Sequence, residues 1–599
     1  MLTDAVCARG KAGRGYRCGS LRVRIFNIRT RCYLASHSVE RPLMRLGQAS
    51  ARRSSTASIS MRRSGGMVKT RKRATLGGLA VLFVLLLVSA LLVVTACGEE
   101  EATTTSGTGA ETTAGPSTTA GSAEIEKVTV AISLEPQTMD PSSSKFAPLN
   151  YPVLANIYDP LVGQNDTGQP DPERGVATWT IQEDGKVIEF KLKEGIKFHS
   201  GDPLTSADVL FTHERTMANN PEYAGYMRQG FDRVEAVDDM TVKFYFTTPN
   251  VLFLYAAAPH LFMVSKTYFD KVGEQEFVAK PVGTGAYKFV EWKTGEYLDL
   301  VRNDDYWGPK PAVKAGHMVF VPDPVTRVQM LQAGEVDLVD TTPWDQVKPL
   351  QQAGYNVAIL EAAPSICVQF HTKNPDVPWG DVRVREAIGL AIDKEAIQRD
   401  IFYGVPGLNA WPADWEVGYN PDLKPMPYDV AKAKQLMADA GYANGFTMPL
   451  VYPAMGMEPK QAAEAVSLYL KEIGITCQVQ ALEMGKLMES MRAWSADPKA
   501  EVVFIMSPAM RGSPDPVIGL QRQFYGKNPM GVYANPKVDA DIEQAVMTYD
   551  NTKRGQLIAD AYANIAKDVA VAPIVAGVTA YATAENLVFT PAAQDPAVI

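Results

Sequence analysis

The strongest constraint on this chain is an apolar segment that lies near its N-terminus. Residues 76–94 are almost entirely apolar, and four basic residues, Lys69, Arg71, Lys72 and Arg73, precede them. This order is typical of a secretory signal, in which a positive region is followed by an apolar core. Nineteen apolar residues can also span a bilayer, so an uncleaved transmembrane helix is the alternative. Under both interpretations the positive-inside rule places the rest of the chain outside the cytoplasm.

The apolar segment ends in Val94-Thr95-Ala96-Cys97, which resembles a bacterial lipobox. In a lipobox the cysteine is acylated and becomes the first residue of the mature protein, so we expect Cys97 to carry a lipid anchor. Each buried acyl methylene contributes about 0.8 kcal/mol to membrane binding. We interpret residues 67–96 as a lipoprotein signal peptide that starts at Met67. Residues 1–66, which are Arg-rich, would then be a mis-annotated or a disordered extension.

Residues 97–124 have the composition of a flexible linker. From Gly98 to Glu124 the sequence contains no aromatic and no branched aliphatic residue. Such a segment cannot bury enough apolar surface to offset its chain entropy, so it should act as a tether. A tether suggests a protein that must reach a membrane partner, although a plain spacer has the same composition. The folded body is expected over residues 125–599.

Charge separates the N-terminal region from this body. Residues 1–96 contain 18 Lys+Arg and two acidic residues, whereas the remainder contains 41 Lys+Arg and 65 Asp+Glu. A body this acidic argues against a nucleic-acid partner, because phosphate binding requires clustered basic residues. No Cys or His spacing indicates a zinc site, and we expect no metal and no cofactor. Cys367 and Cys477 are either two buried thiols or one disulfide.

Apolar periodicity predicts both strands and helices in the body. Alternation around Asp184-Gly185 predicts a hairpin over 179–192, and a second hairpin is predicted over 234–246. Between them, Thr205 and Asp208 have the spacing of a capping box. Later segments have helical periods and caps, namely 384–392, 393–404, 429–440 and 460–473, and a strand over 475–479 follows. This mixture predicts an α/β protein with mixed sheets.

Six segments resemble, in the same order, the family 5 extracellular solute-binding proteins of ABC importers, which include peptide, dipeptide and nickel receptors. Together they cover nearly all of residues 125–599. The segments are 157–161, 192–209, 283–287 with 302–308, 334–337, 381–388 and 428–442.

The resemblance implies a two-lobed, periplasmic-binding-protein-like clamp of type II with an extra inserted subdomain. The implied boundaries are about 125–160, 255–365 and 565–599 for lobe I, 161–254 for the inserted subdomain, and 366–564 for lobe II. A ligand would favour the closed clamp by its differential affinity for that state. The closed form would then dock on an ABC permease and ATPase complex without any chemical step, so we expect no catalytic residues.

Most of the shared segments also have a structural interpretation. We expect His199 to be a structural hydrogen-bonding residue rather than a ligand. Gly283 and Gly285 are expected to supply unusual backbone angles at a crossing between domains. We expect local salt bridges and a helix cap to be formed by Asp381, Arg383 and Arg385.

One departure from the family pattern concerns the ligand. Peptide-binding relatives carry Trp-x-Ala-Asp-Tyr-x-Asp-Pro after a buried strand, and the first Asp holds the α-amino group of the peptide. Here the matching segment is 509–516, in which Gly512 replaces that Asp and Asp515 fits the second. Burying an ammonium without a carboxylate is unfavourable, so binding through a free N-terminus is not expected. Arg511 either binds a carboxylate or another anionic oxygen, or faces solvent.

The ligand contacts that we expect come from both lobes. Two tryptophans lie where relatives line the cleft, and aromatic faces suit sugars, apolar side chains or organic cations; core packing is their alternative. Glu135 and Asp140 follow a first strand, predicted from the alternation of Val128, Val130 and Ile132. His371 is the only histidine to be tested for nickel. The predicted ligand-binding residues are Glu135, Trp411, Trp415, Arg511, Ser513 and Asp515.

These observations favour a lipid-anchored extracytoplasmic receptor for a medium-sized solute, either peptide-like or oligosaccharide-like. A cell-surface hydrolase is the alternative, but the sequence contains no GxSxG or HExxH motif. An adhesin or sensor module built on the same clamp is a further alternative.

Overall fold

The computed structural model describes residues 124–143, 151–454, 457–506 and 515–591. The predicted extension, signal peptide and anchor lie outside the described residues, as does the predicted linker except for Glu124. In the described part, no helix combines the length and the apolar character that a bilayer crossing requires.

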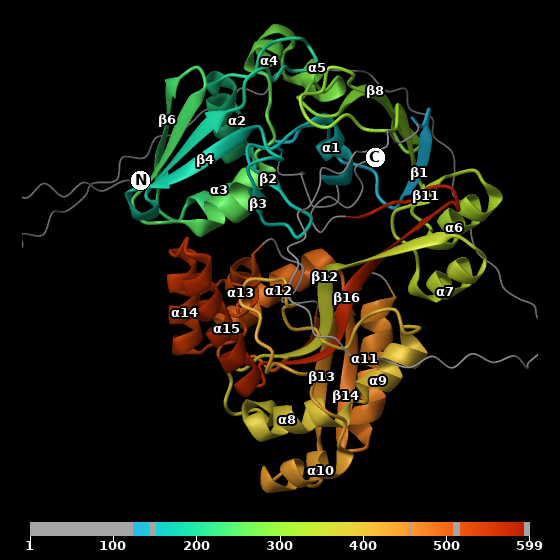
Figure 1. The fold of residues 1–599 in the computed structure, drawn as a ribbon. Helices are drawn as coiled ribbons and strands as arrows, with labels where there is room; N and C mark the ends of the chain where they lie inside the picture. Colours follow the sequence, from blue (N-terminus) through green and yellow to red (C-terminus); the bar gives the residue numbers. More distant parts are fainter. Residues whose placement is uncertain (1–123, 144–150, 455–456, 507–514, 592–599) are drawn as a thin grey trace, which may run out of the picture. The chain divides into compact units, whose positions relative to one another are not determined.

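A ten-stranded mixed sheet organises the fold, in the order β14-β13-β15-β12-β16-β11-β1-β10-β9-β8 (Figure 1). Parallel pairs such as β1–β10 and β13–β14 occur beside antiparallel pairs such as β12–β16, so the predicted mixed α/β class is confirmed. The strands are β1 (Val128–Ile132), β8 (Tyr287–Lys293), β9 (Tyr297–Arg302), β10 (Ala315–Phe320), β11 (Leu338–Val339), β12 (Asn356–Phe370), β13 (Phe446–Pro453), β14 (Ile475–Leu482), β15 (Val503–Met506) and β16 (Val571–Thr583).

The N-terminal lobe consists of β1 and β8–β11 with the helices around them. A buried apolar cluster that includes Val130, Ile157, Leu298 and Met318 forms its core. A side-chain cap fixes the start of α6, where the Asp323 side chain accepts a hydrogen bond from the Thr326 N–H. The helices are α1 (Tyr151–Ile157), α4 (Lys266–Val272), α5 (Glu274–Ala279), α6 (Pro324–Ala333) and α7 (Trp344–Gln352).

The inserted subdomain has its own four-stranded sheet, β4-β5-β7-β6, and its own core, in which the rings of Phe190 and Phe244 lie 5.6 Å apart. Both predicted hairpins are confirmed, as is the capping box of Thr205 and Asp208. Its elements are β4 (Ala177–Gln182), η1 (Glu183–Gly185), β5 (Val187–Leu192), α2 (Ser206–Asn219), α3 (Pro221–Met227), β6 (Phe231–Asp238), β7 (Thr241–Phe246), η2 (Phe253–Ala257) and η3 (Ala258–His260), with the small pair β2 (Gly163–Gln164) and β3 (Pro170–Asp171) before them.

The first hairpin differs from the prediction in its turn. Gln182 pairs with Val187, so four residues connect the strands instead of two. Glu183, Asp184 and Gly185 all have positive φ, at 49°, 54° and 91°. The Asp-Gly pair is therefore one part of a longer left-handed turn.

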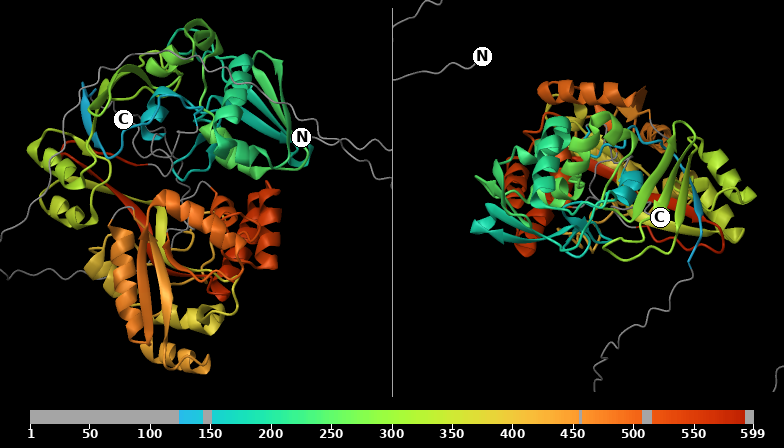
Figure 2. Two further views of the ribbon diagram at one scale, coloured as in Figure 1. Left: turned by 180° about the vertical axis from the view of Figure 1, so that it is seen from behind. Right: turned by 90° about the horizontal axis from the view of Figure 1, so that it is seen from above.

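The C-terminal lobe places β13, β14 and β15 against helices, and α11 packs along β13 and β14 (Figure 2). The helices predicted over 384–392, 429–440 and 460–473 are confirmed, whereas the one predicted over 393–404 is a single α-helical turn followed by a π-helical turn that ends at Ile401. The Asp381, Asp393 and Asp429 side chains cap three of these elements. The elements are η4 (Pro378–Gly380), α8 (Val382–Ala391), α9 (Lys394–Ala396), η5 (Ile397–Ile401), α10 (Val430–Asp439), α11 (Glu458–Lys471), α12 (Met484–Ala496), α13 (Pro516–Gln523), α14 (Pro536–Val546) and α15 (Asn551–Lys567).

Cys367 and Cys477 are both free, so the disulfide alternative is wrong. Cys367 lies on β12 and Cys477 on β14, with β15 and β13 between these strands. Three strand spacings amount to roughly 14 Å, well beyond the reach of a disulfide. Burial raises the pKa of Cys477 to about 11, and burial also raises the pKa of Cys367.

Candidate ligand-binding site

Two strands connect the lobes. One end of β12, at Asn356–Leu360, pairs with Thr579–Thr583 of β16, and β16 pairs there with β11 of the N-terminal lobe. The other end, at Cys367–Phe370, pairs with β15 of the C-terminal lobe. Between these ends the β12–β16 register shifts three times, between Leu360 and Cys367. The regular ladder is therefore interrupted where the chain passes from one lobe to the other.

Two of the shared segments, 157–161 and 283–287 with 302–308, meet at one buried carboxylate. Asp159, in the segment 157–161, accepts hydrogen bonds from Thr284 Oγ1 (2.8 Å), Trp307 Nε1 (2.8 Å) and the Tyr306 hydroxyl (3.0 Å). Burial raises the pKa of Asp159, and these three hydrogen bonds oppose that effect. Residues from 157–161, 283–287 and 302–308 thus meet at one carboxylate within the N-terminal lobe.

The two glycines beside Asp159 correct a prediction. Gly283 and Gly285 do not have positive φ. Instead, a Cβ at Gly283 would lie 2.1 Å from the Ile157 carbonyl oxygen, and one at Gly285 would lie 2.5 Å from the Ile157 carbonyl carbon. Close backbone approach, rather than an unusual angle, is what requires glycine here.

His199 has the structural role that was predicted. Its Nε2 lies 2.9 Å from the Gly285 carbonyl oxygen, and the Gly283 N–H donates to Nδ1 at 3.4 Å. Burial lowers the pKa of His199 to about 4, so the ring is neutral at neutral pH. Both ring nitrogens are engaged by backbone groups.

The predicted set at 381–385 is confirmed in part. Asp381 caps α8, and Arg383 Nη2 lies 2.6 Å from its carboxylate. Arg385 makes no such ion pair. Its guanidinium is buried and donates to backbone carbonyls of residues 379, 380, 568 and 569.

Among the predicted ligand residues, Glu135 lies at the end of β1. Its Oε1 accepts hydrogen bonds from Trp292 Nε1 (3.0 Å) and from the Gly295 N–H (2.8 Å), which tie it to the β8–β9 hairpin. Asp140, which follows in the same loop, pairs with Arg215 Nη2 at 2.7 Å. Both carboxylates are thus engaged within the N-terminal lobe and the inserted subdomain.

Trp411 and Trp415 have different environments. Trp411 is 4% exposed and packs edge-to-face on Tyr562, with ring centroids 6.1 Å apart. Trp415 is 39% exposed. Core packing accounts for the first tryptophan and not for the second.

Asp515 is fully buried at the start of α13. One carboxylate oxygen accepts the Val517 N–H at 2.9 Å, and the other lies 3.1 Å from Arg554 Nη2. Burial raises its pKa, and the Arg554 charge opposes that shift. Burial raises the pKa of Tyr562, and the charges of Glu416 and then Asp515 add to this effect. Arg511 and Ser513 lie outside the described residues.

A direct contact between the inserted subdomain and the C-terminal lobe was not predicted from the sequence. The Tyr549 hydroxyl donates to the Asn250 carbonyl oxygen at 2.6 Å, and the Tyr255 hydroxyl donates to Asn551 Oδ1 at 3.1 Å. The Arg554 guanidinium lies over the Tyr255 ring at 4.1 Å. The hydrogen-bonded pairs are separated by 299 and 296 residues, so no local pattern indicates them.

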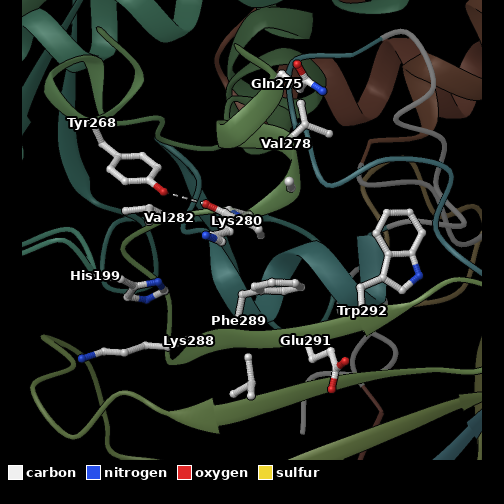
Figure 3. Close-up of a pocket in the computed structure, with 13 residues that line it drawn as sticks. His199, Tyr268, Gln275, Val278, Lys280, Val282, Lys288, Phe289, Glu291 and Trp292 are labelled. Atoms are coloured by element: carbon white, nitrogen blue, oxygen red, sulfur yellow. Dashed lines mark hydrogen bonds between the residues drawn. The ribbon is translucent and has the colours of Figure 1, made fainter. Parts of the chain in front are cut away.

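A cavity of about 710 Å³ opens in the N-terminal lobe beside the edge strand β8. Figure 3 shows Phe289 and Trp292 of β8 among the side chains that line it, with His199 and Tyr268 on the other side of the view; the Tyr268 hydroxyl donates to the Lys280 carbonyl oxygen at 3.1 Å. A second hollow, of about 460 Å³, lies beside α11. None of the predicted ligand residues that the structure describes, namely Glu135, Trp411, Trp415 and Asp515, lines either of these two.

Within the described ranges, no group of three or more His, Cys, Asp or Glu side chains is arranged to hold a metal ion. His371, the histidine to be tested for nickel, is buried and its Nε2 lies 3.0 Å from the Trp494 carbonyl oxygen. This contact is that of a structural histidine.

Similarity to known proteins agrees with the fold. Residues 172–531 match the model of bacterial extracellular solute-binding proteins, family 5 (middle region). Glutathione-binding protein GsiB of Pectobacterium atrosepticum is 29% identical over 411 residues, which cover 65% of this chain and 77% of that protein. Heme-binding protein A of Haemophilus influenzae is 29% identical over 457 residues, which cover 67% of this chain and 78% of that protein.

Solved structures show the same two-lobed fold. The periplasmic binding protein DppA from Helicobacter pylori, in complex with the peptide STSA, superposes with a TM-score of 0.64 at 25% identity and covers 77% of this chain and 94% of its own. NikA from Brucella suis, in complex with Fe(III)-EDTA, gives a TM-score of 0.67 at 24% identity, with 78% and 98% covered. The predicted type II fold is confirmed, and the chain belongs to the bacterial extracellular solute-binding proteins of family 5.

Proposed function

We propose that this protein captures a medium-sized solute outside the cytoplasm and delivers it to an ABC permease and ATPase complex. The observation that carries the proposal is the pair of crossing strands, β12 and β16, whose register is interrupted between the lobes. An interrupted ladder has fewer regular hydrogen bonds to lose when the strands bend. Two lobes with separate cores can therefore rotate about this crossing while each keeps its own packing.

The ligand class follows from the segment after β15. Gly512 stands where peptide-binding relatives have the carboxylate that holds a free α-amino group, and the neighbouring Asp515 is occupied by Arg554 and the Val517 N–H. We therefore propose a peptide-like or oligosaccharide-like ligand that does not bind through a free ammonium. Arg511 would contact an anionic oxygen, and Trp415 would stack on an apolar or sugar face.

Membrane attachment through Cys97 would keep the protein near its permease. The proposal is supported by the lipobox-like sequence after an apolar segment and by the linker composition of residues 98–124. A measured mass of the membrane-extracted protein that includes acyl chains on Cys97 would establish the anchor, and an unmodified thiol there would contradict it.

A thermal-shift screen of the full chain tests solute capture. The panel contains free and N-acetylated tetrapeptides, oligosaccharides, glutathione and heme, the last two because relatives are named for them. A ligand at a hundredfold excess over its dissociation constant stabilises the protein by about 2.7 kcal/mol. We expect a solute that lacks a free ammonium to give this shift, and a panel without any shift would contradict capture of these solute classes.

A matched variant separates the ligand class from capture itself. Gly512→Asp restores the family carboxylate, so it should acquire a response to free tetrapeptides that the wild type lacks. Strong stabilisation of the wild type by free peptides, lost on acetylation, would show that the ligand class is wrong while capture is right.

A further inference from the structure

The contact between the inserted subdomain and the C-terminal lobe combines interactions that stabilise it with buried polar groups that destabilise it. We define this lobe contact as Asn250, Leu252 and Tyr255 on one side and Tyr549, Asn551 and Arg554 on the other. Figure 1 shows α15, on which Asn551 and Arg554 lie, on the side of the C-terminal lobe next to the inserted subdomain. Its parts act on closure in different directions.

Apolar burial and two hydrogen bonds favour the closed contact. Val251 and Phe253 belong to the core of the inserted subdomain, whereas Leu252 between them is fully buried with Val517 and Leu520 of the C-terminal lobe. The Tyr549 and Tyr255 hydroxyls donate across the contact. The Tyr549 ring also packs on Gly185, where a Cβ would lie 2.8 Å from it. Separating the lobes would expose all of this surface.

Arg554 opposes the closed contact. Its side chain is fully buried, and only Nη2 has partners, Asn551 Oδ1 at 2.6 Å and Asp515 Oδ2 at 3.1 Å. Among the described residues, Nε and Nη1 have no hydrogen-bond acceptor, and across the contact the buried Asn250 Oδ1 has no donor. Buried polar groups without partners are unfavourable, and the Tyr255 ring offsets this only in part.

We infer that the lobe contact balances closure, with Leu252, Tyr255 and Tyr549 favouring the closed form and the incompletely bonded Arg554 opposing it. Opening would admit water to Nε, Nη1 and Asn250 Oδ1, for which the described residues supply no hydrogen-bond partner. A solute then needs only a modest preference for the closed form to shift the equilibrium. Arg554 is in this sense a positioning residue, and the inference rests on the proposed solute capture.

Hydrogen exchange of the full chain without solute, followed by mass spectrometry, tests this balance at residues 250–256 and 549–556. Leu252→Ala/Tyr549→Phe should open the contact and accelerate exchange there, roughly tenfold. Asp515→Asn/Arg554→Met removes the unmet donors together with the paired carboxylate, and should slow exchange below that of the wild type. Small-angle scattering should show a larger radius of gyration for the first variant and not for the second.

The sign of the second effect distinguishes the inference from a structural role. If Arg554 only held the fold together, its replacement would accelerate exchange, and that result would overturn the inference. Unchanged exchange in both variants would also overturn it. If the double variant does not fold, Arg554→Lys keeps the ion pair with fewer donors and should also slow exchange. Because no solute is present, failure here leaves the thermal-shift test of capture independent.

Discussion

Two buried arginines of the C-terminal lobe have opposite hydrogen-bonding states. Arg385, which is 6% exposed, uses all three nitrogens: they donate to the carbonyls of residues 379, 380, 568 and 569 at 2.6 to 3.1 Å. Arg554 is more buried, yet two of its nitrogens have no acceptor among the described residues. The first lies inside one lobe, and the second lies where the lobe meets the inserted subdomain.

The difference shows how location decides what a buried cation does. Inside a lobe the surroundings of Arg385 need not change, so complete hydrogen bonding contributes to stability throughout. At a contact that must open, complete bonding in the closed form would hold the protein shut. The incomplete bonding of Arg554 is therefore consistent with a contact that forms and breaks.

The largest expected effect on stability comes from removing the hydrogen bonds of Arg385. Arg385→Met leaves the carbonyls of residues 379, 380, 568 and 569 without their donor, so we expect the free energy of unfolding to fall by about 3–5 kcal/mol. Urea denaturation measures this loss. A decrease below about 1 kcal/mol would show that the carbonyl cluster is satisfied without the arginine, and the comparison would fail.

Lys394 is a buried cation inside the C-terminal lobe that has fewer hydrogen bonds than Arg385, and its effect on the free energy of unfolding should depend on pH. Its amine is buried and donates to the carbonyls of Gly389 (2.6 Å) and Ile392 (3.1 Å). Burial lowers the pKa of Lys394 to about 8, with Asp393 opposing the shift. The unfolded chain therefore binds more protons between about pH 8 and 10.5, so the free energy of unfolding should rise with pH across this window.

The matched variant is Lys394→Met, which has no proton to lose. The difference in unfolding free energy between wild type and variant should change by up to about 3 kcal/mol between pH 7.5 and 10. Parallel pH profiles of the two proteins would contradict the lowered pKa.

A smaller effect is expected at the lobe contact. Tyr255→Phe removes the hydroxyl that donates to Asn551 but keeps the ring under Arg554. One hydrogen bond contributes about 1 kcal/mol, so solute affinity should fall about fivefold because the closed form is less populated. Isothermal titration with the solute from the screen measures this. An unchanged affinity would mean that this hydroxyl does not contribute to closure.

The smallest effect is expected at Arg383, which lies two residues before Arg385. Its side chain is 47% exposed, and its ion pair with Asp381 faces water. Arg383→Met should leave the urea midpoint unchanged, since exposed ion pairs contribute little. A shift as large as that of Arg385→Met would show that burial and carbonyl bonding do not separate the two arginines.

Local sequence patterns predicted the elements of this fold well. The hairpin over 179–192, the cap at Thr205 and the cap at Asp381 each depend on residues fewer than fifteen positions apart, where periodicity and capping chemistry apply. The turn at Glu183–Gly185 was predicted too short, because strand register, and not the Asp-Gly pair alone, decided its length. The prediction that residues 283 and 285 must be glycine was right, but the reason is close backbone approach and not an unusual backbone angle.

The site was much less predictable. Arg385 was expected to form an ion pair, because the sequence shows Asp381 nearby and does not show the carbonyls of residues 568 and 569. The contact between Tyr255 and Arg554 was not predicted, because it depends on how the inserted subdomain packs against a lobe that comes much later in the chain. Exposure also could not be read from sequence: Trp411 is buried and Trp415 is not.

The sharing of β16 has a consequence for synthesis. Ala572, Ile574 and Val575 complete the core of the C-terminal lobe, while Ala582 of the same strand packs in a cluster of the N-terminal lobe. The C-terminal lobe therefore cannot finish its packing before residue 575 is made, nor the N-terminal lobe before residue 582. Both cores stay incomplete until this late strand has been added.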